Sequence, residues 1–342
     1  MPTKPIFEKK NILVTGGAGF IGSHLCDYLI KDSKVICIDN FISGSERNID
    51  HLLQHPDFQF IKHNINEPID LNTLPELEKF QVAFQGIQEI YHLASPSSPL
   101  DFDKHKIETV VTNSVGTKNI LDLAVKYNAK FLLASSSVVY GPKNDQVKRF
   151  SETFEGVVDH LSPRACYDEG KRFSETITRT YGQFYNLDTK IARIFRTYGP
   201  RMELNSGQML PDFVFNALDG QDLVIYGDES FSSSLCHVSD IVEGMVKMMK
   251  SGEAGPINIG SELEYRITDV AKKVIDMVQS QSKIVYEKPL LFMTPLGLPD
   301  ITLAKERLGW FPVMLLEEGL HGTIDYFRAH KVQIGPTSQL KG

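Results

Sequence analysis

The fold is decided by Val14-Thr15-Gly16-Gly17-Ala18-Gly19-Phe20-Ile21-Gly22. This stretch follows a short apolar run with the composition of a buried strand, and it opens a segment with the helical period that ends near Lys31. Gly16 permits a tight turn, Gly19 lets a pyrophosphate approach the backbone, and Gly22 lets the helix pack closely on the strand. The N-terminus of that helix offers free N–H groups to phosphate oxygens. The pattern therefore predicts a dinucleotide-binding strand-turn-helix unit.

The same alternation of strand and helix continues through the first two thirds of the chain. Strands separated by helices form right-handed crossover units and a parallel sheet, so we predict an α/β, doubly wound Rossmann fold. The predicted strands are residues 11–15, 34–39, 58–63, 89–94, 130–135 and 189–195. The predicted helices between them include 19–31, 104–127 and 164–186. Residues 69–88 are long for a connection, and we expect one helix there, in an inserted surface element.

A second, smaller lobe is expected after the sheet, because 342 residues exceed the size at which one core usually stops growing. We assign residues 1–200 to the dinucleotide-binding domain and 201–342 mainly to an α/β substrate-binding lobe, whose strands and helices can also return to the first domain. The shorter elements predicted in the second part are strands at 223–226 and 256–259 and helices at 239–250, 267–281 and 315–329.

Asp39 ends the second predicted strand, at the separation from the glycines that suits an acid accepting both hydroxyls of the adenosine ribose. A carboxylate there repels a 2′-phosphate, so we predict NAD rather than NADP as the cofactor. Further contacts are expected from nearby loops and from the ends of the fourth and fifth strands. The predicted cofactor-binding residues are Gly16, Gly19, Phe20, Ile21, Gly22, Asp39, Asn40, Ser43, Gly44, Asn64, Ile65, Leu93, Ala94, Ser95, Thr112, Ser135, Tyr167 and Lys171.

Tyr167 and Lys171 are the predicted catalytic pair, because they are four residues apart and share one face of a predicted helix. A phenol has a pKa of about 10, and lowering it by about three units needs roughly 4 kcal/mol, which the Lys171 ammonium and an oxidised nicotinamide ring can supply together. Ser136, at the end of the fifth strand, would hold the substrate hydroxyl while Tyr167 takes its proton. An amphipathic helix with an interfacial tyrosine and an exposed lysine is the alternative.

Several further motifs make the chain resemble the extended short-chain dehydrogenase/reductase family over essentially its whole length, and within it the UDP-glucuronate decarboxylase-like enzymes. The resemblance implies retained NAD, oxidation at C4 of a nucleotide sugar to a ketone, a second step made easy by that ketone, and return of the hydride. The motifs are 91–96 (YHLASP), 163–172 (PRACYDEGKR), 192–195 (ARIF), 198–202 (YGPRM) and 299–301 (PDI), the last before 308–310 (LGW).

The chain departs from that group at several positions with functional side chains. Val138 stands where the decarboxylases and 4,6-dehydratases carry a Glu, and Ser137 stands where the dehydratases carry an Asp, so 4,6-dehydration loses its usual catalysts. Cations are lost as well, at Val111, at Ser233 and in the stretch 296–298 (LGL), which ends at Leu298. Charge-assisted hydrogen bonds are each worth roughly 1.5–3 kcal/mol, so these losses matter for a uronate diphosphate.

One cation is gained, because Arg196 replaces the Asn that usually precedes Thr197. We predict that Ser136, Ser137, Arg196, Arg201 and Tyr226 contact the substrate, although Arg196 as an ordinary surface residue is an equal alternative. By this count of charges the pocket either selects a neutral sugar or relies on arginines for the phosphates. We therefore expect UDP-glucuronate to be a poor substrate.

Composition excludes several other classes of protein. A net charge of −7 leaves no basic field for a nucleic-acid backbone, and no apolar run approaches the roughly 20 residues of a membrane span. Four scattered cysteines lack metal-type spacing and follow no secretory signal, so we expect a cytoplasmic protein with reduced thiols and no metal site.

A nucleotide sugar is thus the predicted substrate, with the sugar, the base and the net reaction left open. A nucleotide-sugar 4-epimerase is the alternative to a decarboxylase, a net dehydrogenase comes next, and a non-catalytic NAD-binding regulatory protein is the alternative from another class. The family resemblance also implies a homodimer, formed through helices 104–127 and 164–186.

Overall fold

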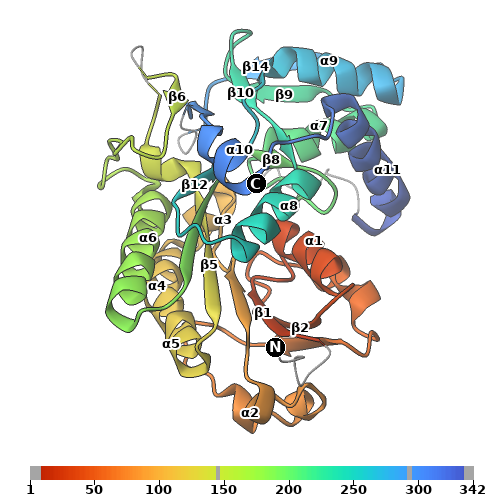
Figure 1. Cartoon of the computed structure of the whole chain (residues 1–342). Coiled ribbons are helices and arrows are strands. Elements are labelled where there is room, and N and C mark those ends of the chain that lie inside the picture. The colour runs from red at the N-terminus through yellow and green to blue at the C-terminus, as the bar shows by residue number, and fades with distance from the viewer. Residues whose placement is uncertain (1–8, 144–146, 291–294, 335–342) are drawn as a thin grey trace.

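A computed structural model describes residues 9–143, 147–290 and 295–334. Its centre is a seven-stranded sheet in the spatial order β12-β7-β5-β4-β1-β2-β3, and all its pairs are parallel (Figure 1). The order reverses direction at β1, as in a doubly wound sheet. The predicted α/β Rossmann fold is therefore confirmed. Its strands are β1 (Asn11–Thr15), β2 (Lys34–Asp39), β3 (Phe58–Lys62), β4 (Glu89–His92), β5 (Lys130–Ser136), β7 (Thr189–Ile194) and β12 (Ile257–Ile259).

Helices cover both faces of this sheet, because its central strands are apolar on both sides. One face packs on α1, α8 and α10, and the other on α5, α6 and the segment that precedes β4. The helices, in chain order, are α1 (Phe20–Leu29), α2 (Val82–Gln85), α3 (Pro99–Lys104), α4 (Lys106–Val111), α5 (Thr117–Tyr127), α6 (Ala165–Tyr185), α7 (Met209–Asp219), α8 (Val238–Lys250), α9 (Ile267–Val278), α10 (Thr302–Leu308) and α11 (Leu316–Ile334).

The predicted helix 104–127 is interrupted at both its start and its middle. His105 leaves helical geometry between α3 and α4, and a π-helical turn, η5 (Thr112–Gly116), joins α4 to α5. Residues 69–88 also differ from the expected single helix. They form two 3-10 helices, η3 (Leu71–Thr73) and η4 (Pro75–Phe80), before α2, because Pro75 cannot continue a helix and Gln81 has a left-handed φ of 52°.

This segment is not merely a surface insertion either. The side chains of Leu71, Leu77 and Phe80 are buried and belong to the core beneath the sheet. The prediction of an inserted surface element is therefore wrong in this respect, because these apolar side chains are buried against the sheet.

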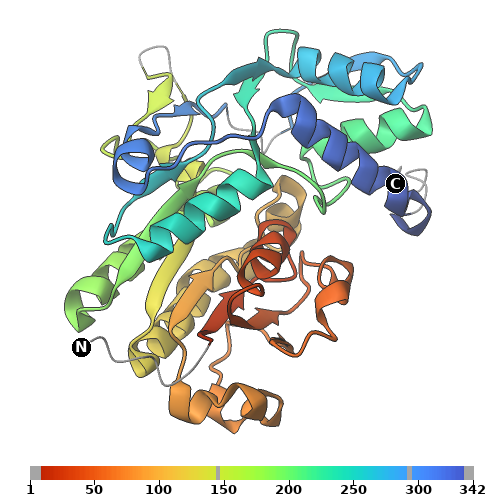
Figure 2. The same cartoon turned by 45° about the vertical axis from the view of Figure 1, so that its right-hand side comes forward.

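The second lobe lies beyond the carboxyl ends of the strands and has a core of its own (Figure 2). That core combines α7, α9 and α11 with the parallel pair β9 (Leu223–Tyr226) and β14 (Ile284–Glu287). The chain does not divide cleanly near residue 200, since β12 pairs with β7 and Trp310 is buried in the core of the first domain. The short remaining strands are β6 (Arg149–Phe150), β8 (Thr197–Tyr198), β10 (Ser232–Ser234), β11 (Cys236–His237), β13 (Glu264–Arg266) and β15 (Leu298–Pro299).

Within the described ranges, no helix combines the length and the apolar composition that crossing a membrane requires.

Candidate active site

A cavity of about 740 Å3 lies along the carboxyl ends of the sheet strands, between the sheet and the second lobe. Ligands of open α/β sheets bind at this edge, on the side where the strand order reverses. All the predicted site residues except Tyr226 line this cavity. Tyr226 lies on β9 in the second lobe, where its backbone N–H points at the Met209 sulfur at 3.4 Å, and its contact with the substrate stays a prediction.

The glycine turn after β1 has no room for side chains at two positions. Gly16 has a φ of 73°, and a Cβ atom there would lie 2.7 Å from the Ala94 backbone nitrogen. A Cβ atom on Gly22 would lie 2.1 Å from the Gly16 carbonyl oxygen. The turn therefore brings α1 close to the strand ends and leaves its N-terminal N–H groups facing the cavity, which is the cradle that a dinucleotide pyrophosphate requires.

The Asp39 carboxylate is held rigidly beside this cradle. It accepts backbone N–H groups from Ala18 at 3.0 Å and from Phe41 at 2.8 Å. Burial raises its pKa, and these backbone hydrogen bonds oppose the rise. A carboxylate has about four acceptor sites, so Asp39 keeps acceptor capacity for a ribose hydroxyl. A 2′-phosphate would need a cation near Asp39, and no described neighbour supplies a cationic partner to this carboxylate. These residues therefore fit an adenosine ribose that lacks a 2′-phosphate.

We predict that Asp39→Ala weakens NAD binding and relaxes the preference over NADP. The substitution removes both the acceptor for the ribose hydroxyls and the charge that repels a 2′-phosphate. Isothermal titration with each cofactor measures this, and Asp32→Ala, an exposed acid before β2, is the matched control. Equal affinity of the wild type for NAD and NADP would contradict the assignment.

Tyr167 and Lys171 lie on the first turns of α6, and both are almost fully buried at the cavity wall. The Tyr167 ring stacks on Phe102, with 5.2 Å between ring centroids. Burial raises the pKa of the Tyr167 phenol to about 12, although its hydrogen bond with Ser136 opposes that shift. Ser136 and Tyr167 are thus within hydrogen-bonding reach of each other, and their roles toward a substrate hydroxyl stay a prediction. The phenol is neutral at pH 7, so it acts as a base only after further positive charge reaches the cavity.

Lys171 is the fixed source of such charge. Its Nζ donates a hydrogen bond to the Ala134 carbonyl at 3.0 Å and lies 5.8 Å from the centroid of the Tyr167 ring. Burial lowers the pKa of the ammonium to about 8, and Glu175 opposes that shift. Lys171 also helps to lower the pKa of buried His92 to about 3, after burial itself. The alternative of an exposed lysine on an amphipathic helix is excluded by this burial.

Since the pKa of Lys171 is lower in the folded than in the unfolded chain, the ammonium destabilises the fold below pH 8. This penalty disappears as pH rises from about 8 to about 10.5, because Lys171 then becomes neutral in both states. We predict that Lys171→Met stabilises the cofactor-free protein at pH 7, by an amount on the order of 3 kcal/mol that shrinks across this window.

Urea unfolding of wild type and variant at several pH values measures the difference. Lys272→Met, on the exposed side of α9, is the control and should show no such pH dependence. A constant difference between pH 7 and pH 10.5 would mean that Lys171 does not titrate with a lowered pKa.

Val138, at the position where the family resemblance leads us to expect a Glu, has apolar neighbours in the structure. Val138 is buried in a small cluster with Phe102 and Tyr167, against which Cys166 and Leu296 pack. Phe102, Val138 and Leu296 all line the cavity next to the catalytic tyrosine. Position 138 therefore offers no carboxyl group to a substrate bound at Tyr167.

The two predicted arginines differ in their surroundings. Arg201 is ion-paired with Asp27 at 2.7 Å, and its Nη1 is buried without a hydrogen-bond partner among the described residues. Arg196 lines the cavity without an ion pair or side-chain hydrogen bond to any residue that the structure describes. Burial, and then the charge of Arg164, lowers its pKa.

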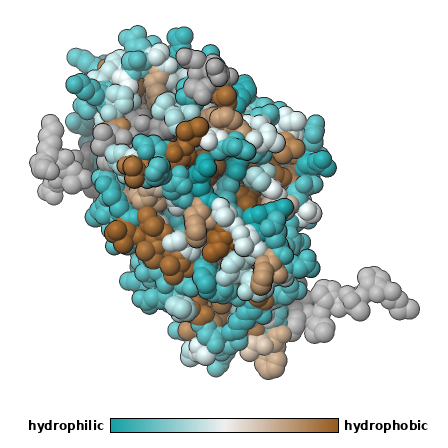
Figure 3. All heavy atoms as spheres, turned by 90° about the vertical axis from the view of Figure 1, so that its left-hand side faces the viewer, coloured by the Kyte–Doolittle hydropathy of each residue, from teal (hydrophilic) through white to brown (hydrophobic). Residues whose placement is uncertain are grey.

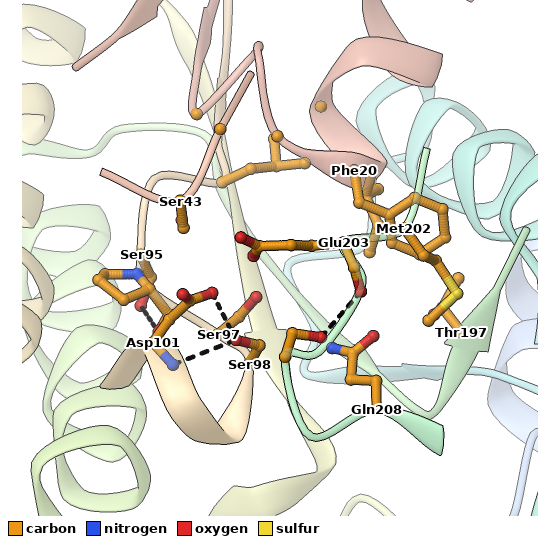
Figure 4. Close-up of a pocket in the computed structure, with 18 of the residues that line it drawn as sticks. Phe20, Ser43, Ser95, Ser97, Ser98, Asp101, Thr197, Met202, Glu203 and Gln208 are labelled. Atoms are coloured by element: carbon orange, nitrogen blue, oxygen red, sulfur yellow. Dashed lines mark hydrogen bonds between the residues drawn. The ribbon is translucent and has the colours of Figure 1, made fainter. Parts of the chain in front are cut away.

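An acidic pair that the sequence did not single out faces the same cavity. Glu203, in the loop after β8, reaches toward Asp101 of α3 on the opposite wall, where Ser98 hydrogen-bonds the Asp101 carboxylate (Figure 4). Burial, and then Asp101, raises the pKa of Glu203 to about 7. Nothing in the sequence indicates that Glu203 would meet Asp101.

Comparison with known proteins agrees with this geometry. Residues 12–260 match the model of the NAD dependent epimerase/dehydratase family. The chain belongs to that family. It is 41% identical over 330 residues to UDP-glucuronic acid decarboxylase 1 of Xenopus tropicalis, covering 96% of this chain and 75% of the relative. It is also 39% identical to UDP-glucuronic acid decarboxylase 6 of Arabidopsis thaliana, covering 90% and 86%.

Solved structures of this family share the fold. UDP-glucose 4-epimerase of Thermotoga maritima, solved with UDP-glucose, aligns with a TM-score of 0.82 at 29% identity, over 94% of this chain and 99% of the other. UDP-glucuronic acid 4-epimerase of Bacillus cereus, solved with UDP-glucuronic acid and NAD, aligns with a TM-score of 0.79 at 28% identity, over 93% and 99%. The predicted family and enzyme class are thereby confirmed, and NAD is the cofactor of this enzyme.

Proposed function

We propose that this enzyme modifies a nucleotide sugar through a transient 4-keto sugar, and that decarboxylation of a nucleotide-linked uronate is its leading reaction. The observation that carries the proposal is the group of Ser136 with the buried Tyr167 and Lys171 at the carboxyl edge of the sheet, beside the glycine cradle. The similarity to UDP-glucuronic acid decarboxylases over most of the chain supports the choice of reaction.

In the proposed mechanism, Gly16, Gly22 and Asp39 hold the cofactor's pyrophosphate and ribose. NAD, when bound, supplies positive charge near the phenol and accepts the hydride that leaves C4 of the sugar. Ser136 orients the 4-hydroxyl group, and the Tyr167 oxygen takes its proton. Lys171 stabilises the phenolate electrostatically, at 5.8 Å from the ring centroid. A ketone at C4 lies β to the C6 carboxylate of a uronate, so breaking the C5–C6 bond releases CO2 and leaves its electron pair in an enolate across C4 and C5. C5 would then take a proton from water, because no acid stands at position 138. Return of the hydride to C4 and of the proton from Tyr167 to the C4 oxygen would complete the reaction.

A 4-epimerase is the second candidate, and the apolar cluster around Val138 favours it specifically. Epimerisation needs only the three catalytic residues and room for the keto sugar to turn, whereas 4,6-dehydration needs the acid that this cluster lacks.

Incubation with NAD and a panel of nucleotide sugars, followed by mass spectrometry, separates these reactions. We expect loss of CO2 from a uronate, whereas unchanged mass with an altered C4 configuration would show epimerisation.

We predict that Tyr167→Phe lowers turnover by roughly 10²–10⁴-fold, because only the basic oxygen is removed. NAD affinity and the fold should survive, whereas Lys171→Ala should impair both turnover and cofactor binding.

A Tyr167→Phe enzyme that retains more than about a tenth of the wild-type rate would place the base elsewhere. Phe184→Tyr, at an exposed position of α6, is a control for handling and folding. If no nucleotide sugar of the panel reacts although NAD binds, the proposed reaction through a 4-keto nucleotide sugar is contradicted.

We also propose that two copies associate through α4 and α6, in the cytoplasm. These helices pack side by side and leave large apolar side chains exposed on their outer surface. Figure 3 faces this side of the molecule and shows apolar atoms gathered among polar ones. An isologous contact between two such helix pairs buries both faces in a four-helix bundle. The exposed apolar residues of η5 and these helices are Ile107, Val110, Val115, Phe173, Phe184 and Tyr185.

We therefore predict a dimer mass by light scattering at micromolar concentration. Ile107→Glu should shift the protein toward monomer, because Ile107 is 74% exposed on α4 and a charge there would be desolvated at the interface. Leu263→Glu, exposed to 62% outside these helices, is the control and should leave the mass unchanged. A wild-type monomer would contradict the proposal.

A further inference from the structure

The register between β5 and β7 places Arg196 beside Ser136. Ile194 of β7 is in register with Ser136 of β5, so the residues that follow each of them leave the sheet edge side by side. Arg196 comes two residues after Ile194, and it lines the same cavity as Ser136. Its backbone is fixed, because its carbonyl oxygen accepts the Cys236 N–H at 3.0 Å.

A second arginine lies at the same corner of the cavity. Arg164 precedes α6 and contacts Asp168 through two hydrogen bonds of 2.7 and 3.0 Å. Its guanidinium lies 5.6 Å from the centroid of the Phe102 ring, which stacks on Tyr167. The charge of Arg164 acts on both the Tyr167 phenol and the Arg196 guanidinium. The two arginines are therefore close to each other and to the reacting end.

The charges at this corner are out of balance. Asp168 already neutralises Arg164, whereas no described carboxylate hydrogen-bonds or ion-pairs with Arg196. Two acidic groups of the cavity, Asp101 and Glu203, contact one another across its walls, and a third, Asp39, accepts backbone N–H groups beside the glycine turn. A guanidinium shielded by protein and left without a partner is costly, and a bound anion would remove that cost.

We propose that Arg196 binds a carboxylate on the sugar ring and thereby selects an acidic nucleotide sugar. The inference rests on the proposed function, and it assigns the specificity-determining contact to Arg196.

This placement reverses the expectation that UDP-glucuronate is a poor substrate. That expectation counted the cations lost along the sequence, but the count could not show that the gained cation lies next to Ser136. A carboxylate at C5 of the sugar is two bonds from C4, the carbon that the Ser136 and Tyr167 pair serves. A diphosphate lies on the anomeric side of the ring, farther from that carbon.

The test compares Arg196→Gln, Arg196→Lys and wild type by titration of the NAD-loaded protein with UDP, UDP-glucose and UDP-glucuronate. We expect Arg196→Gln to weaken UDP-glucuronate about 10- to 100-fold, the range for a lost charge-assisted hydrogen bond, and to leave the other two ligands within about twofold. Arg196→Lys should recover part of the loss. Arg307→Gln, on the exposed side of α10, is the control and should bind like wild type.

Equal weakening of all three ligands would overturn the proposal, because the guanidinium would then contact the shared diphosphate. Unchanged binding of UDP-glucuronate by Arg196→Gln would also overturn it. Wild-type protein that binds UDP-glucose and rejects UDP-glucuronate would overturn this inference alone and leave the proposed C4 chemistry intact. Failure of wild type to bind any of the three would instead overturn the proposed function. Thermal melting and NAD affinity of each variant confirm that the fold is retained.

Discussion

Parallel pairing of β5 with β4 on one side and β7 on the other holds three carboxyl strand ends at one edge of the sheet. Ser136 ends β5, Arg196 follows β7, and the loop after β4 carries Ser95 on its way to α3. These side chains share one cavity only because the register keeps their strands level. If β5 or β7 slipped by one residue relative to its neighbours, the side chains of that strand would change faces of the sheet. Ser136 or Arg196 would then leave the side of the Tyr167 phenol.

Burial is the second condition on which the chemistry depends. The same protein that surrounds Tyr167 and Lys171 raises the pKa of the phenol and lowers the pKa of the ammonium, so both groups favour their neutral forms. A phenol with a pKa of about 12 needs roughly 7 kcal/mol of preferential stabilisation to titrate near pH 7. Positive charge brought by the cofactor would therefore contribute to the activation of this base.

The cavity is divided electrostatically along its length. Its cationic corner, with Arg164 and Arg196, adjoins the catalytic tyrosine, whereas its acidic pair, Asp101 and Glu203, joins the loop after β4 to the loop after β8. The apolar wall formed by Val138, Phe102 and Leu296 lies beside the tyrosine. Such a layout orients an asymmetric ligand, because an anionic group is favoured at one corner and repelled at the other.

The sequence by itself determined the sheet, the glycine turn, Asp39 and the spacing of Tyr167 and Lys171, because these follow from local patterns of period, turn and helix face. It did not determine the path of residues 69–88, where burial by distant strands overrode a helix-like spacing. Nor could it show that Glu203 meets Asp101 or that Arg196 stands unpaired beside Ser136. Those contacts join segments that are far apart in the chain, so only the tertiary packing of strands and lobes decided them.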